Sequence, residues 1–186
     1  TLSGINTYTG STTISAGTLA LSASGAIANS SGVAATGTFD IGGTTSGASI
    51  KTLSGAGGVT LGANTLTITT GADTYSGVMS GTGGLTLSGG TQTLSGANTY
   101  TGGTTIANGT LNLGAASAIS SSGNITFSGG TLQYSTSNQA DYSSRFSTAD
   151  SQQYKIDTNS QNITLASALT SNNGTLVKYG SGTLTL

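Results

Sequence analysis

The chain has 186 residues, of which only nine are charged, and its net charge at neutral pH is −1. The four basic residues are scattered, whereas binding to nucleic acid or an anionic membrane needs clustered Lys and Arg, so neither is an expected partner. The absence of Cys and His excludes disulfides, the usual zinc sites and every catalytic triad that needs a thiol or an imidazole.

A short pattern recurs along the chain, in which two apolar residues flank one small or polar residue, usually after Gly or Thr. This period-two alternation predicts half-buried strands, and Thr at the outward positions suits a pleated surface. In chain order the pairs are Leu19/Leu21, Phe39/Ile41, Val59/Leu61, Leu85/Leu87, Leu111/Leu113, Leu132/Tyr134, Ile163/Leu165 and Leu184/Leu186. Two further strands are expected at Leu66/Ile68 and Ile125/Phe127.

The spacing of these strands predicts the fold class. Successive pairs are separated by 20, 20, 26, 26, 21, 31 and 21 residues, and a step of 20 or 21 residues is about one turn of a three-sided solenoid. We therefore expect an all-β parallel β-helix (β-solenoid) of about 8–9 rungs, with Leu ladders inside and Thr, Ser and Asn ladders outside. The longer steps are attributed to extra strands and to one insertion.

Two segments of the chain are nearly identical. Residues 1–21 and 93–113 share 16 of 21 positions at an offset of 92, so we expect one solenoid over 1–186, built from a repeat unit 1–92 and a second copy 93–186. Within these segments six residues are predicted to stabilise rung contacts or corners, with their inward or outward direction left open. They are Asn6, Tyr8, Gly10, Asn98, Tyr100 and Gly102. Exposed Tyr and Asn would alternatively suit carbohydrate contact.

Residues 136–158 differ from the rest because they hold five of the nine charges. We expect a loop or short-helix insertion near 136–155 that protrudes from the rod and is salt-bridged, followed by a return strand at YKIDT. Long loops in compact folds are often functional. The candidate binding surface for a glycan or a host surface consists of Asp141, Tyr142, Arg145, Phe146 and Tyr154.

With these motifs in view, TLSGANTYTGGTTIANGTL and KYGSGTLTL resemble the autotransporter-associated β-strand repeat of bacterial surface and secreted proteins. The segment from SGGTLQYSTSNQADYSSRFS to YKIDTNSQNITLASALTS is similar to the spacer that recurs between copies in very long proteins of that kind. The resemblance implies a right-handed parallel β-helix, a stalk-like passenger, and a location outside the cell or on the bacterial surface. Neighbouring repeats of the same chain are then its first partners.

Little in the sequence indicates catalysis. The five acids are all Asp and only three of them lie close together in sequence, so no carboxylate pair, metal site or cofactor is expected and the protein is not predicted to be an enzyme. A flat ice-binding array is not expected either, because the outward residues of successive predicted strands change. They are Ala20, Asp40, Thr60, Thr86, Asn112 and Gln133.

The sequence thus favours a structural stalk or spacer module. One alternative is an adhesin that binds a glycan or host surface through residues 136–158. The other is a self-assembling fibre subunit, because an uncapped solenoid exposes edge strands at both ends and could associate end to end. No segment is long and apolar enough for membrane insertion.

Overall fold

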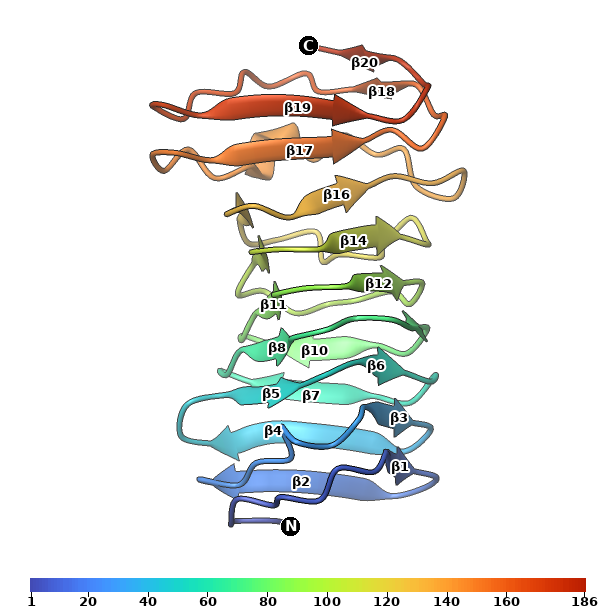
Figure 1. Cartoon of the computed structure of the whole chain (residues 1–186), viewed down its shortest axis with the longest axis vertical. Coiled ribbons are helices and arrows are strands. Elements are labelled where there is room, and N and C mark those ends of the chain that lie inside the picture. The colour runs from blue at the N-terminus through green and yellow to red at the C-terminus, as the bar shows by residue number, and fades with distance from the viewer.

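Each turn of the chain makes up to three short strands, which lie on three faces of a rod that we call faces A, B and C in chain order. The computed structural model describes all residues 1–186, coiled into about nine turns. The chain climbs from the N-terminus at one end to the C-terminus at the other (Figure 1). All paired strands are parallel, so the predicted all-β solenoid is confirmed.

Face A carries a strand in every turn. Its strands are β1 (Thr12–Ile14), β3 (Val33–Ala35), β6 (Leu53–Ser54), β9 (Thr74–Tyr75), β12 (Thr91–Leu94), β14 (Thr110–Leu113), β16 (Thr131–Gln133), β17 (Gln153–Asp157) and β19 (Thr175–Tyr179). A bridge between Gly55 and Tyr75 joins the ladder of β1, β3 and β6 to the ladder that starts at β9.

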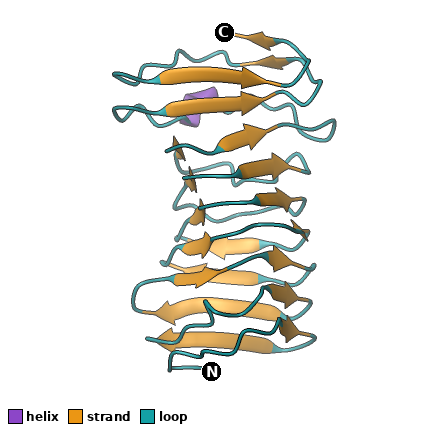
Figure 2. Ribbon diagram, in the orientation of Figure 1, coloured by secondary structure: helices purple, strands orange, loops and turns teal.

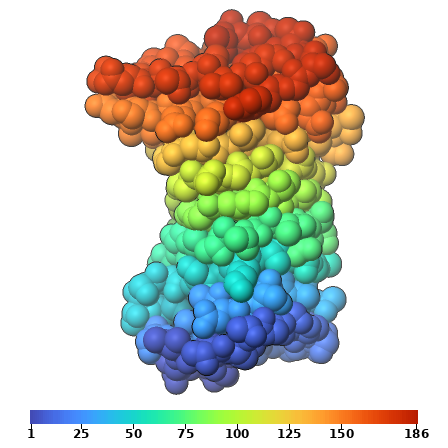
Figure 3. Space-filling view, in the orientation of Figure 1, coloured from blue at the N-terminus to red at the C-terminus, as the bar shows by residue number.

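Face B is regular near both ends and irregular between them. Its strands are β2 (Thr18–Ala23), β4 (Thr38–Thr44), β7 (Val59–Gly62), β10 (Met79–Gly81), β18 (Ile163–Thr164) and β20 (Leu184–Thr185). The chain between β10 and β18 crosses this face without regular strands. In the green and yellow turns of this region the rod is narrower than at its two ends (Figure 3).

Face C completes each turn. Its strands are β5 (Ala48–Ile50), β8 (Leu66–Ile68), β11 (Leu85–Leu87), β13 (Thr104–Ile106) and β15 (Ile125–Phe127). The only helical segment is the short 3-10 turn η1 (Ser143–Arg145), drawn in purple in Figure 2. In Figure 1 the nearer face A strands run to the right and the more distant face B strands to the left as the chain climbs, which is the sense of a right-handed coil.

The core is a single column along the rod. In a typical three-residue strand such as β11, the outer residues Leu85 and Leu87 are buried and the central Thr86 faces outward. The 34 buried apolar residues form one continuous cluster. Because burying one Leu or Ile side chain contributes about 1.5–3 kcal/mol, the column can stabilise a rod that has few charges on its surface.

The pairing registers show that the turns differ in length. Val33 pairs with Leu53 and Tyr75 pairs with Leu94, whereas Leu132 pairs with the more distant Ile156, so the turn that follows Leu132 is enlarged. Leu19 on β2 pairs in parallel with Phe39 on β4, which confirms the stacking of like strands that the sequence predicted.

The structure corrects the explanation of the longer steps. Val59, Leu85 and Leu111 lie on faces B, C and A in turn, so each 26-residue step is one turn plus an advance of one face. The long step from Leu132 to Ile163 is likewise one enlarged turn and a further advance from face A to face B. The strand signature therefore moves around the rod, and no large insertion is needed to explain the spacing.

The two near-identical segments also lie on different faces. The TTI strand of the first copy is β1 on face A, whereas that of the second copy is β13 on face C. Each segment nevertheless spans one turn, because Leu2 pairs with Leu21 and Leu94 pairs with Leu113. The repeat therefore specifies one turn of coil, whichever face it begins on.

Candidate functional site

The segment predicted to protrude is instead one turn of the rod. Asn138 donates its amide hydrogens to the carbonyl oxygens of Ala115 and Ala116 in the turn below. Phe146 forms a parallel bridge with Ile125 on face C, and β17 returns the chain to face A. The return strand and the short helical turn are confirmed, but the segment is an enlarged turn and does not project as a separate loop.

Three aromatic residues of the predicted binding surface are buried, which corrects the expectation that they face a ligand. Tyr142, Phe146 and Tyr154 are 7%, 5% and 2% exposed. The Phe127 and Phe146 rings lie 4.9 Å apart in an edge-to-face arrangement, and the Tyr154 ring lies 5.5 Å from Phe127. These rings fill the wider interior of the enlarged turn.

The two charged members of that surface link neighbouring turns and do not pair with each other. Asp141 accepts hydrogen bonds from the backbone N–H groups of Ser143 and Ala166 at 2.8 and 2.9 Å. Burial raises the pKa of the Asp141 carboxyl, but the hydrogen bonds from Ser143 and Ala166 outweigh it, so the pKa lies below its ordinary value.

The Arg145 guanidinium is bound by backbone oxygens. It donates to the carbonyl groups of Ser120, Ser122 and Gly123 in the turn below. Burial lowers the pKa of Arg145 from its ordinary value. The three lysines also donate to carbonyl oxygens, so no basic side chain donates a hydrogen bond to a carboxylate. The expected salt-bridged insert is therefore wrong.

The repeat-motif residues make equivalent contacts in both copies. Asn98 donates to the carbonyls of Gly96 and Ala118, and Asn6 donates to the corresponding carbonyls of Gly4 and Ala26. The hydroxyls of Tyr8 and Tyr100 each lie 2.7 Å from the hydroxyl of a Thr further along the same turn. Asn98 and Tyr100 point inward, at 4% and 0% exposure.

The motif glycines differ in their surroundings. A Cβ atom at Gly102 would lie 2.6 Å from backbone atoms of Gly83 and Thr82 in the turn below, so only Gly fits there. Gly10 lies at the N-terminal end of the rod, where a Cβ would meet nothing within 4 Å.

Face C carries an outward threonine row that the sequence did not predict. Pairing registers align four central residues of consecutive strands, namely Thr67, Thr86, Thr105 and Thr126. The outward residues compared in the sequence came from different faces, so their variation did not exclude such a row. A row of neutral hydroxyls can hydrogen-bond to water or to a hydroxylated ligand but supplies no acid, base or nucleophile of shifted pKa.

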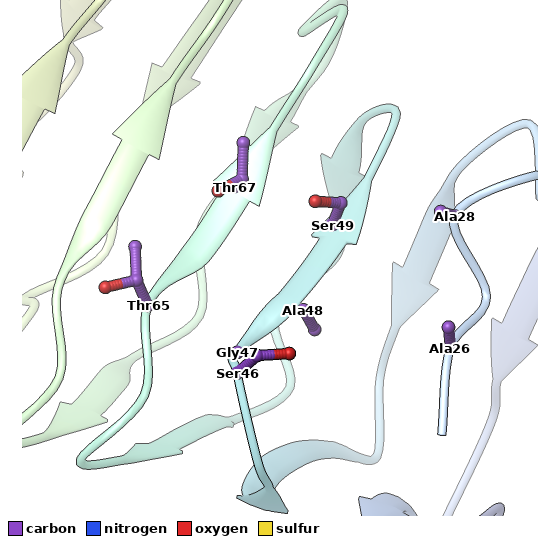
Figure 4. Close-up of a pocket in the computed structure, with 8 residues that line it drawn as sticks. All are labelled: Ala26, Ala28, Ser46, Gly47, Ala48, Ser49, Thr65 and Thr67. Carbon is purple, nitrogen blue, oxygen red and sulfur yellow. The ribbon is translucent and has the colours of Figure 1, made fainter. Parts of the chain in front are cut away.

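An open groove of about 270 Å³ lies at the N-terminal end of this row. Figure 4 shows Thr67 and Ser49 side by side on β8 and β5, with Ala28 continuing the row in the turn below. The lining residues are all small or hydroxylated and none is charged or aromatic. The groove is therefore a shallow neutral surface without the convergent polar groups of a catalytic pocket.

The five aspartates do not form a metal site, since no group of three or more acidic side chains comes together. Asp73 accepts a 2.6 Å hydrogen bond from the Thr52 hydroxyl, and Asp157 accepts one from Gln133. Both contacts join neighbouring turns. The structure contains no helix long and apolar enough to cross a membrane.

Buried amides are the residues that sequence reasoning missed. Gln92 is fully buried, and its amide donates to the carbonyls of Leu53 and Asp73 while accepting from the Leu53 N–H. It therefore ties together three successive turns. The available signal was its position, because Gln92 occupies an inward register place of TQTL where an apolar residue is normal.

A comparison with protein families identifies the repeat. The family model described as passenger-associated-transport-repeat matches residues 1–21 and 89–113. These segments contain all six motif residues discussed above. The resemblance to autotransporter passenger repeats is thus confirmed, and the chain carries two copies of the repeat within its β-solenoid. No curated protein and no solved structure is significantly similar to the chain.

Proposed function

We propose that this chain, which carries two passenger-associated transport repeats in an unbroken coil, is a stiff, non-catalytic spacer of a bacterial protein exported to the cell surface or the medium. The observation that carries the proposal is the pairing of face A, where each strand from β9 to β19 stacks in parallel on the one before. Such a ladder fixes the distance between the two ends of the rod.

The bonds between turns support this role. Backbone hydrogen bonds run from each turn to the next, for example from Thr99 N–H to the carbonyl of Met79 and from Thr101 N–H to that of Gly81. Side chains such as those of Gln92 and Arg145 add bonds between turns. A force along the rod must break several of these bonds in each turn, so the rod resists extension.

The experiment removes whole turns. Deleting residues 12–52 joins Ser11 to Leu53 in register, because Thr12 pairs with Val33 and Val33 with Leu53. We expect a folded rod that is shorter by about 10 Å, since stacked strands lie about 4.8 Å apart. Spin labels near the two ends and pulsed electron paramagnetic resonance measure the change.

The matched control deletes residues 12–42, which correspond to about one and a half turns. Ser11 is then followed by Gly43, so that outward residues take inward places on the rod and inward residues take outward places. This variant should lose its cooperative unfolding transition. Equal stability of the two deletions would contradict a register-built spacer. Specific binding of the intact chain to glycans on an array would instead support the adhesin alternative and overturn the proposal.

A further inference from the structure

One corner in the middle of the rod holds a backbone nitrogen against a side-chain amide. Asn108 and Gly109 belong to the corner between strands β13 and β14, on faces C and A. The Gly109 N–H donates to the Asn108 Oδ1 at 2.8 Å. Because a C=O bond is about 1.2 Å long, the Asn108 Cγ lies within about 4 Å of the Gly109 nitrogen.

The stacking of the corner explains this contact. The N–H groups of Asn108 and Thr110 donate to the carbonyls of Leu87 and Gly90 in the turn below, whereas the Gly109 N–H donates to no backbone oxygen. A Cβ at Gly109, where φ is +74°, would lie 2.2 Å from the Gly90 oxygen, so only Gly fits there. The side chain of Asn108 therefore satisfies the one N–H of this corner that the turn below does not accept.

The other half of the Asn108 amide is free. The side chain is exposed, and its Nδ2 donates no hydrogen bond within the protein. Water can reach the Cγ atom, and a leaving nitrogen can depart into solvent without breaking a contact of the rod. The corner thus combines a nucleophilic atom, an electrophilic carbon beside it and an unhindered leaving group.

We propose that Asn108 is a site of spontaneous self-modification, at which the Gly109 nitrogen attacks the Asn108 Cγ. The attacking nitrogen gives its proton to water, the N–Cγ bond forms, and the Cγ–Nδ2 bond breaks as Nδ2 takes up a proton and leaves as ammonia. Water then opens the resulting succinimide ring and leaves aspartate or isoaspartate at position 108. One water is consumed and one ammonia released, and nothing is oxidised or reduced.

A second Asn-Gly pair in the chain has the same chemistry but a different geometry. At Asn173-Gly174 the Gly174 N–H donates to the carbonyl of Ser171 at 3.1 Å and makes no hydrogen bond to the Asn173 side chain. Its nitrogen is therefore held by the backbone and not by the neighbouring amide. The folded chain should react at Asn108 and spare Asn173.

The reaction makes the two repeats chemically different. The first repeat cannot react in this way, because Ala16 stands at the place of Asn108, before Gly17. Residues 89–113 contain no charged side chain, so either product gives the second repeat its first carboxylate. The new charge appears on the surface of a rod that otherwise carries very few.

The test follows the masses of two tryptic peptides. Cleavage after Lys and Arg leaves Asn108 in residues 52–145 and Asn173 in residues 156–178. After the folded chain has stood for days at mildly alkaline pH, the first peptide should gain about 1 Da, located at position 108 by fragmentation. The rate at 108 should exceed that at 173 by about tenfold or more, with a sample digested at the start correcting for change during digestion. No change at 108, or a change at 173 that is as fast, would overturn the proposal.

Two controls separate the effect of the fold from that of the sequence. N108A gives the second repeat the residue that the first has in this place, so it should fold equally well by circular dichroism. On anion exchange it should not develop the more strongly retained species, matching N108D, that the original chain forms with time. In urea the Gly174 nitrogen is released, so the ratio of the two rates should fall to about one. An unchanged ratio in urea would contradict the role assigned to the corner.

Discussion

At the scale of single residues, stability depends on polar groups buried in a narrow apolar column. Gln92 satisfies the N–H and C=O groups of Leu53 and the C=O of Asp73. A buried backbone group that loses its partner costs about 1–3 kcal/mol. The change Q92A should therefore lower the free energy of unfolding by about 2–3 kcal/mol.

Urea unfolding followed by circular dichroism measures this loss. The control is T93A, which changes the neighbouring outward residue of β12 and should have an effect within about 0.5 kcal/mol. Equal effects of Q92A and T93A would show that the bonds between turns made by Gln92 contribute nothing.

Tyr134 presents the opposite case, since its buried hydroxyl has no hydrogen-bond partner. Y134F removes an unsatisfied group and keeps the ring, so the free energy of unfolding should stay the same or rise by about 1 kcal/mol. The matched control is Y75F, because the Tyr75 hydroxyl donates to the carbonyl of Gly57 at 2.7 Å. Thermal unfolding should show Y75F to be less stable than Y134F, and the reverse order would contradict this reasoning.

At the scale of elements, the corners set how closely turns approach. A Cβ at Gly83 would lie 1.8 Å from the carbonyl oxygen of Asn64, a contact that only backbone movement relieves. G83A should therefore lower the free energy of unfolding by more than about 2 kcal/mol. G10A is the control, since a Cβ there meets nothing within 4 Å. A comparison of their urea midpoints tests the difference, and similar midpoints would mean that the corner can relax.

The strands themselves could be predicted from the sequence because alternation distinguishes inward from outward residues. Leu66 and Ile68, for example, are buried on either side of an outward Thr67, as expected. Alternation does not say which of three faces a strand joins, so the longer steps between strand pairs were misassigned. The face depends on the accumulated length of all preceding corners, which short-range patterns do not encode.

The candidate site was less predictable than the strands. Tyr142, Phe146 and Tyr154 lie in the enlarged turn, whose length breaks the usual spacing, so their direction could not be inferred. Their burial follows from the wider interior that the extra residues enclose. The threonine row on face C could not be predicted either, because alternation does not show which strands share a face. Its members lie a full turn apart in the sequence, among many other Thr residues.

At the scale of the whole molecule, the chain has only nine charged residues and no His, so few groups titrate near neutral pH. The free energy of unfolding should therefore change mainly at high and at low pH. Burial raises the pKa of Tyr100 to about 12 and raises the pKa values of Tyr75 and Tyr134 as well. An unfolded Tyr has a pKa of about 10, so the stability that these rings contribute is complete below that pH and is lost as pH rises through the folded values. Urea unfolding at successive pH values should give a constant free energy from about pH 6 to 9 and a decline above about pH 10.

At low pH the free energy of unfolding is expected to change in the opposite direction, falling as the pH falls; we call this part of the pH profile the acid limb. The pKa of Asp141 is lower in the folded state, so its contribution is present above its ordinary value and is lost as pH falls through the folded pKa. D141N should remove this acid limb and leave the alkaline decline unchanged. A chain that loses stability steadily between about pH 6 and 9 would contradict both expectations.

The first and second repeats start on different sides of the same coil, and the interval between them is not a whole number of turns. If the same interval recurred along a longer array, successive copies would begin on different faces and would be arranged helically around the rod axis. Any group attached to the outside of each repeat would then point away from the axis at a different angle in each successive copy. The attached groups of such a rod would be distributed evenly around its axis, so the rod would present the same average surface in every rotational orientation.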